Sequence, residues 1–148
     1  MHSLPLAHTL VYIRLVPRNR LRIPFFGSLV KAGFPSPASD YIERVCDLND
    51  LCIHNAEATY FVRVDGDSMI DEHIMPGDIM VVDCSLETVN GRIVVAWYNG
   101  AHTVKRLRTA PPLIVLEPAN EKYEPIYIQP GDDFKLFGVV TFVIHKTT

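Results

Sequence analysis

Residues 60–70 read Tyr60-Phe-Val-Arg-Val-Asp-Gly-Asp-Ser-Met-Ile70. The first half is rich in aromatic and β-branched side chains, which favour a half-buried strand. Asp65-Gly66 then predicts a tight turn, because glycine adopts backbone conformations that other residues avoid. The stretch therefore predicts a strand over Thr59–Val64 that ends in a turn and presents a single serine, Ser68.

The β pattern continues from this stretch to the end of the chain. Short runs rich in β-branched residues alternate with turn signals such as Asn90-Gly91 and Pro130-Gly131. The predicted strands are Thr59–Val64, Ile79–Asp83, Arg92–Tyr98, His102–Leu107, Leu113–Pro118, Ile126–Ile128 and Phe134–Ile144. Asn99-Gly100 lies between two of them and is a strong hairpin signal. Strands with a turn about every 8–12 residues predict an all-β barrel or sandwich.

The residues before this region have a less regular pattern. Met1–Leu15 mixes apolar and polar residues and predicts no element, whereas Arg22–Lys31 is compatible with a strand or one short helix. Two prolines and a glycine make Ala32–Ala38 an extended, exposed linker. Extended backbone is also what a peptidase site accepts, so this segment is either a plain linker or a substrate. Asp40–Glu43 can start a helical turn.

Composition favours one globular domain with a sizeable core. The chain has 148 residues, of which 48% are hydrophobic and 21% charged. No apolar run approaches the roughly 18 residues that a membrane span needs. The chain has an odd number of cysteines, Cys46, Cys52 and Cys84, and none of them forms a Cys-x-x-Cys pair. Its six histidines are scattered along the sequence. We therefore expect a reduced, cytoplasmic protein with no metal and no cofactor.

Charge is distributed unevenly along the chain. Residues 1–39 hold five basic and no acidic side chains, which is formally +5. The other residues hold 9 basic and 17 acidic side chains, which is formally −8. A basic arm on an acidic body could bind nucleic acid or lie against its own domain, and we favour the second interpretation. An acid-free, arginine-rich leader also resembles a transit peptide, but Pro17 and Pro24 would interrupt its helix.

Ser68 and Lys105 are the candidate catalytic pair. A serine hydroxyl is a weak nucleophile and needs a base beside it. A lysine can be that base if burial lowers the pKa of its ammonium group, because a low dielectric disfavours the charged form. Backbone N–H groups left unpaired by the turn at Ser68 could stabilise an oxyanion.

Strand alternation indicates how Lys105 is buried. It shares one strand face with Thr103 and Leu107, so it can point inward while Arg106 takes the solvent. The alternative reading of the same residues makes Ser68 a helix N-cap and Lys105 a surface lysine. Spacing alone does not exclude that alternative.

Four motifs in order resemble a known family. They are Gly66-Asp-Ser-Met69, Ile74-x-x-Gly-Asp78, Gly91-x-Ile-Val94 and Thr103-Val-Lys-Arg-Leu107, and Phe137-Gly-Val-Val140 resembles the last core strand. Over about residues 32–145 the chain is similar to the LexA/UmuD self-cleaving serine peptidases. The resemblance implies a mainly β, compact peptidase domain of short twisted strands with an extended N-terminal arm. It also implies Ser68 as nucleophile, Lys105 as general base and Ala32-Gly33 as the cleaved bond.

Further stretches resemble the UmuD branch. They are Gly33-Phe-Pro-Ser-Pro-Ala38, Asp47-Leu-Asn49 and Ala58-Thr-Tyr-Phe-Val62. This resemblance implies a bacterial accessory protein of error-prone translesion DNA synthesis in the SOS response. Its arm, residues 1–32, would be removed by self-cleavage, and residues 33–148 would be the active peptidase and polymerase-accessory domain.

The same resemblance implies partners. They are a second copy in a homodimer, a RecA filament on single-stranded DNA as stimulator, and a UmuC-like subunit of a Y-family DNA polymerase. Direct sequence-specific DNA binding and membrane attachment are not expected. Two alternatives stay open at this point: a truncated repressor of the LexA or phage type, and an interaction module without catalysis.

Overall fold

The computed structural model describes residues 12–14, 23–26, 32 and 42–148. They belong to two units. Residues 12–14 and 55–148 form the larger unit, and the described residues from 23 to 54 form the smaller one. The predicted boundary between an arm, 1–32, and a domain, 33–148, stays a prediction.

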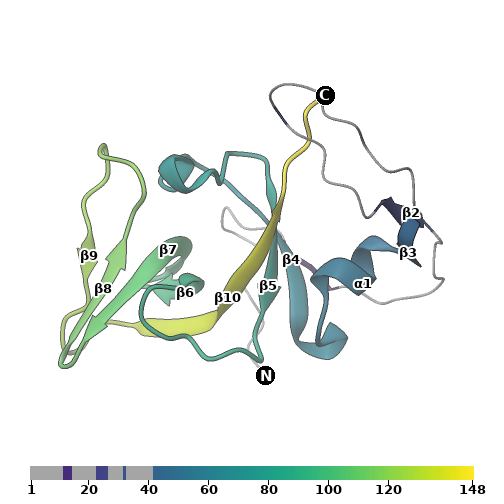
Figure 1. Ribbon diagram of the computed structural model, residues 1–148. Helices are drawn as coiled ribbons and strands as arrows, with labels where there is room; N and C mark the ends of the chain where they lie inside the picture. The colour runs from purple at the N-terminus through teal and green to yellow at the C-terminus, as the bar shows by residue number, and fades with distance from the viewer. Residues whose placement is uncertain (1–11, 15–22, 27–31, 33–41) are drawn as a thin grey trace. The chain divides into compact units, whose positions relative to one another are not determined.

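The larger unit is built on one antiparallel sheet of eight strands, in the order β1-β4-β5-β10-β6-β7-β8-β9 (Figure 1). The strands are β1 Tyr12–Arg14, β4 Thr59–Arg63, β5 Ile79–Asp83, β6 Ile93–Tyr98, β7 Ala101–Ala110, β8 Leu113–Glu117, β9 Ile126–Tyr127 and β10 Phe134–Ile144. Two single-turn 3₁₀ helices, η1 Ala56–Ala58 and η2 Ile70–Glu72, lie in the connections on either side of β4. The mainly β fold predicted from the sequence is confirmed, as an open sheet rather than a barrel or sandwich.

Strand β10 joins the two halves of the sheet. Its first half pairs with β6 and its second half with β5, and the register shifts once in each pairing. Gly138 lies at the first shift, where an added Cβ would come within 2.9 Å of Val82 Cγ1 and 3.0 Å of the Asp83 carbonyl oxygen. A glycine is therefore needed at position 138 for β10 to approach β5 this closely. In Figure 1, β10 is the long yellow strand that curves between β5 and β6.

Two apolar clusters form the core. One contains Val62, Val64, Met69, Ile74, Met80, Val82, Val95 and Val104, and the other contains Val94, Ala96, Leu107 and Leu116. Met69 is 1% exposed. Met69 follows Ser68 directly in the chain. The burial of Met69 therefore anchors the turn that contains Ser68 to the core.

The sequence predicted all seven strands after residue 58 to within a few residues. The Asn99-Gly100 hairpin is also confirmed, because both residues have positive φ, 43° and 92°. Strand β1, which pairs with β4, was not predicted, because three residues are too few to show a period.

The smaller unit contains β2 Ile23–Phe26, β3 Ile42–Cys46 and α1 Leu48–Cys52. Strands β2 and β3 pair antiparallel, so the helical turn predicted from Asp40–Glu43 is wrong for Ile42 and Glu43. Asp47 caps α1, and its carboxylate accepts the backbone N–H of Asp50 at 3.0 Å.

In the part of the chain that the structure describes, no helix is long and apolar enough to cross a membrane.

Candidate active site

The turn after β4 is held by backbone bonds on both sides. The Val64 N–H donates to the Asp78 carbonyl at 2.8 Å, and the Gly77 N–H donates to the Val64 carbonyl at 2.9 Å. Gly66 has a φ of 85°, which a residue with a side chain rarely adopts. The chain is thereby reversed, and Ser68 is presented just before η2. No side chain caps η2, whose N-cap is Met69, so Ser68 is not the helix cap of the alternative reading.

Lys105 of β7 lies against this turn. Its Nζ donates to Ser68 Oγ at 2.9 Å, to Thr103 Oγ1 at 2.6 Å and to the Val104 carbonyl at 3.1 Å. Lys105 is 7% exposed. The predicted inward orientation of Lys105 is thus confirmed.

Burial lowers the pKa of the Lys105 ammonium group from 10.5 to about 8. The physical cause is desolvation, because no carboxylate accepts a bond from Nζ in the described residues. A lysine with this pKa is partly neutral near neutral pH. It can therefore accept the proton of a hydroxyl group that lies within hydrogen-bond distance.

The buried charge should lower the stability of the fold. Below about pH 8 both the folded and the unfolded states hold the proton, so the folded state bears the whole penalty. Stability should rise with pH between about 8 and 10.5, since the folded state releases the proton first. The difference between these pKa values corresponds to about 3 kcal/mol.

We therefore expect Lys105→Met to raise the free energy of unfolding at about pH 7 by about 1–3 kcal/mol, less at higher pH. Urea unfolding at two pH values measures this, with Ser68→Ala as the common background so that the chain stays whole. Lys122→Met is the control, because Lys122 is exposed and its side chain lies outside the pair. A Lys105→Met protein less stable than its parent at neutral pH would contradict a destabilising buried charge.

A pocket of about 150 Å³ opens beside the pair. It is lined by the turn, residues 65–68, by residues 102–105 of β7, and by Tyr123. Among the described residues, the backbone N–H groups of Ser68 and Met69 donate to no other residue. The pocket thus brings together a hydroxyl, a buried amine and the N–H donor of Ser68, which are groups that acyl transfer requires.

Sequence reasoning placed Thr103 on the same strand face as Lys105 but assigned it no role, although its hydroxyl accepts a bond from the amine. It missed two other side chains at this site, Asn120 and Tyr123. Asn120 and Tyr123 bond to Asp67 from positions more than fifty residues further along the chain, and no local pattern signals such contacts.

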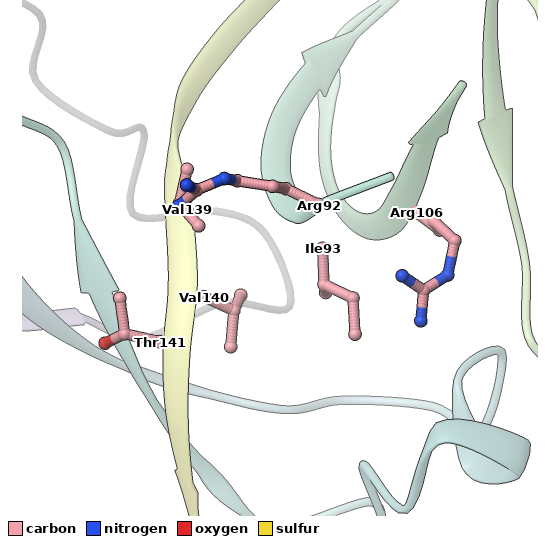
Figure 2. A pocket seen from close by; sticks show the side chains of 6 residues that line it. All are labelled: Arg92, Ile93, Arg106, Val139, Val140 and Thr141. Carbon is pink, nitrogen blue, oxygen red and sulfur yellow. The ribbon is translucent and has the colours of Figure 1, made fainter. Parts of the chain in front are cut away.

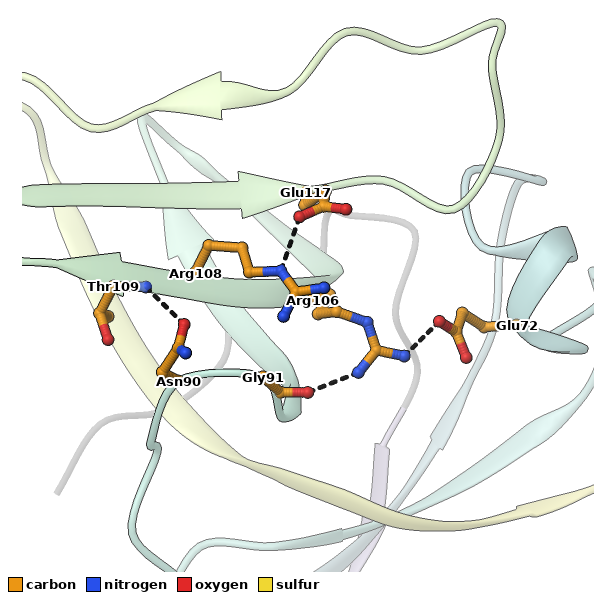
Figure 3. Close-up of polar contacts among 7 residues, drawn as sticks. All are labelled: Glu72, Asn90, Gly91, Arg106, Arg108, Thr109 and Glu117. Carbon is orange, nitrogen blue, oxygen red and sulfur yellow. Dashed lines mark hydrogen bonds and ion pairs between the residues drawn. The ribbon is translucent and has the colours of Figure 1, made fainter.

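The expectation that Arg106 takes the solvent holds only in part, because its side chain is 23% exposed and is bonded to two other residues. Its guanidinium donates to the Gly91 carbonyl oxygen at 2.5 Å and forms an ion pair with Glu72, as Figure 3 shows. Glu72 belongs to η2, which follows Ser68 by a few residues. Arg106 therefore links β7 to the helical turn after the serine.

A second pocket, of about 440 Å³, is shown in Figure 2. Its lining residues are Arg92, Ile93, Arg106, Val139, Val140 and Thr141. It contains no carboxylate, histidine, serine or cysteine side chain, so no acid–base pair is available there. Of these two pockets, the one at Ser68 contains a hydroxyl beside a buried amine, and we take it as the candidate active site.

Of the two residues of the predicted cleavage site, Ala32 belongs to the smaller unit and is exposed. Gly33 lies outside the described residues. The described part of the chain has no group of three or more His, Cys, Asp and Glu side chains that could hold a metal ion.

Comparison with known proteins shows what this chain is similar to. Residues 24–141 match the family described as peptidase S24-like. Protein SamA of Salmonella typhimurium is 46% identical over 124 residues, which cover 84% of this chain and 86% of SamA. Protein MucA of Escherichia coli is 42% identical over 120 residues, 80% of this chain and 82% of MucA. The LexA repressor of Paracidovorax citrulli is less similar, 34% identical over 129 residues, which cover 87% of this chain and 57% of LexA.

Proposed function

The chain belongs to the peptidase S24-like family and is a UmuD-like protein of SOS mutagenesis. On that premise we propose that the chain cleaves itself at the Ala32–Gly33 bond, with Ser68 and Lys105 as the catalytic pair. The family consists of self-cleaving serine peptidases. The observation that carries the proposal is the distance of 2.9 Å between Lys105 Nζ and Ser68 Oγ, with the amine buried. Membership in a peptidase family disfavours the interaction module without catalysis, and the lower identity to LexA disfavours the repressor.

The reaction follows from the roles of these groups. Neutral Lys105 takes the Ser68 proton as Oγ attacks the Ala32 carbonyl carbon, and the oxyanion that forms accepts bonds from backbone N–H groups at the turn. Lys105 then gives the proton to the Gly33 nitrogen as the C–N bond breaks. Ser68 is left esterified to Ala32. A water molecule attacks the ester while Lys105 accepts its proton, and the return of that proton to Oγ frees the serine.

Thr103 supports this cycle by its position. Its hydroxyl accepts a bond from Lys105 Nζ at 2.6 Å, so it restricts the rotation of the amine while Nζ faces Ser68. A hydroxyl adds no charge, so this contact can orient the amine without an ion pair that would raise its pKa.

Self-cleavage should accelerate with pH. The reactive form needs neutral Lys105, whose pKa is about 8, so the rate should rise about tenfold between about pH 7 and 9 and level off above that. The measurement is the loss of full-length protein on incubation over this range, with the mass of each product. Ser68→Ala incubated in parallel is the control for adventitious proteolysis. A flat or falling profile would remove Lys105 from the role of base.

The partners implied by the family are also part of the proposal. Residues 33–148 hold 9 basic and 17 acidic side chains, so phosphates would repel this fragment. We propose that it acts in the bacterial cytoplasm through protein contacts, as a homodimer that binds a UmuC-like Y-family polymerase, after a RecA filament on single-stranded DNA stimulates cleavage. Sedimentation and a polymerase pull-down, with uncut Ser68→Ala for comparison, test this. Equal polymerase binding by both forms would contradict it.

A further inference from the structure

The connection between β8 and β9 is bonded to the turn that carries Ser68. The Ala119 N–H donates to the Ser68 carbonyl oxygen at 2.8 Å, and the Asp71 N–H donates to the Ala119 carbonyl at 2.8 Å. One residue of this connection is thus bonded both to the serine and to the 3₁₀ helix that follows it.

Asn120 extends this attachment to the other side of the serine. Its Nδ2 donates to the Asp67 carbonyl oxygen at 2.9 Å, and its Oδ1 accepts the Lys122 N–H at 3.0 Å. Asn120 is 7% exposed. A buried amide with both ends bonded has little freedom to turn, so the Asp67 carbonyl is held in one direction.

Tyr123 holds the side chain of the same residue. Its Oη donates to Asp67 Oδ1 at 2.5 Å, and both residues line the pocket at Ser68. This hydrogen bond to the carboxylate raises the pKa of Tyr123, so the phenol stays protonated and remains a donor. Backbone and side chain of Asp67 are therefore both bonded to residues 120–123.

We propose that Asn120, assisted by Tyr123, is a positioning residue for self-cleavage: it holds the Asp67–Ser68 peptide so that Ser68 Oγ stays within reach of Lys105 Nζ. This inference rests on the proposed function. The plane of that peptide sets the direction of the Ser68 N–H and of the bond from Cα to Cβ. A displacement of a reacting atom by about 1 Å can slow a reaction about a hundredfold.

The sharpest test is Asn120→Asp in the full-length chain. Aspartate has the same shape and still accepts the Lys122 N–H, but it cannot donate to the Asp67 carbonyl. We expect self-cleavage about 10–100-fold slower than in the wild type. The melting temperature should fall, because a carboxylate oxygen then faces the Asp67 carbonyl oxygen at a buried position, so cleavage is measured well below it. Asn120→Ala should slow the reaction similarly without moving the midpoint of the pH profile, because Lys105 keeps its surroundings.

A second readout separates the positioning of Ser68 from binding of the cleaved segment. A fluorophosphonate probe labels a reactive serine without needing the Ala32–Gly33 bond, and labelling should slow about as much as cleavage does. Asn90→Ala is the matched control. Asn90 Oδ1 also accepts a backbone N–H across a connection, from Thr109 at 2.9 Å, as Figure 3 shows. Asn90 is not among the residues that line the pocket at Ser68.

Two results would overturn the inference. One is cleavage and labelling by Asn120→Asp within about twofold of the wild type, and the other is slow cleavage with normal labelling. If the Asn120 variants are unfolded by circular dichroism, Tyr123→Phe decides, with the exposed Tyr127→Phe as control. If Tyr123→Phe is labelled more slowly than the wild type while Tyr127→Phe is labelled at the wild-type rate, the positioning role is supported. If both variants are labelled at the wild-type rate, it is refuted. A wild-type chain that does not cut itself would instead refute the proposed function.

Discussion

Ser68→Ala and Lys105→Ala are each expected to slow self-cleavage at least about a thousandfold, because a nucleophile and its base act as a unit. Removing Oγ leaves nothing to attack the carbonyl, and removing the amine leaves the serine proton without an acceptor at 2.9 Å. The measurement is the fraction of full-length protein remaining over time at about pH 9, where the wild-type rate should be close to its plateau. The double variant should be no slower than either single one.

Two matched substitutions control for the loss of a hydroxyl or an amine elsewhere. Ser85→Ala removes a hydroxyl that bonds to Asp83 outside the pocket, and Lys122→Ala removes an exposed amine. Both should cut at the wild-type rate. If Ser68→Ala or Lys105→Ala did so as well, its assignment to the catalytic pair would be wrong.

Gly33→Glu is expected to block cleavage. In the proposed reaction, the residue after the cut enters a pocket of about 150 Å³ whose lining residues include Asp65 and Asp67. A third carboxylate would meet repulsion there, and the backbone would lose the freedom of glycine. We expect a rate at least about a hundredfold lower than that of the wild type, measured as loss of full-length protein.

The matched control is Ser36→Glu, which introduces the same charge three positions further on and should be tolerated. Gly33→Ala separates size from charge and should retain part of the activity. Mass spectrometry of the wild-type products has to show a new N-terminus at Gly33. A cut at any other bond would refute the cleavage site, whatever it implied for the pair.

The strands after residue 58 were predictable because their signals are local. Alternation of apolar residues, β-branched side chains and turn dipeptides all act within a few residues, so no knowledge of neighbouring strands is needed. Asn99-Gly100 shows this well: both residues adopt positive φ, which the hairpin requires and which asparagine and glycine tolerate.

The elements that the sequence did not predict depend on pairing. Strand β1 has three residues, and its strand conformation comes from bonds to β4. Ile42 and Glu43 are compatible with a helical turn by composition, yet they are extended because β3 pairs with β2. A short segment with a weak preference adopts the conformation that satisfies its backbone hydrogen bonds.

For the site, the sequence by itself determined the turn that presents Ser68, the strand that carries Lys105 and the residues, Thr103 and Leu107, that share a face with that lysine. All three follow from local sterics and the two-residue period of a strand. Only the tertiary structure decided that the two side chains meet, since they lie 37 positions apart. It also decided the pKa of Lys105, because desolvation depends on which distant residues surround the amine, and the attachment of Asp67 to Asn120, 53 positions along the chain.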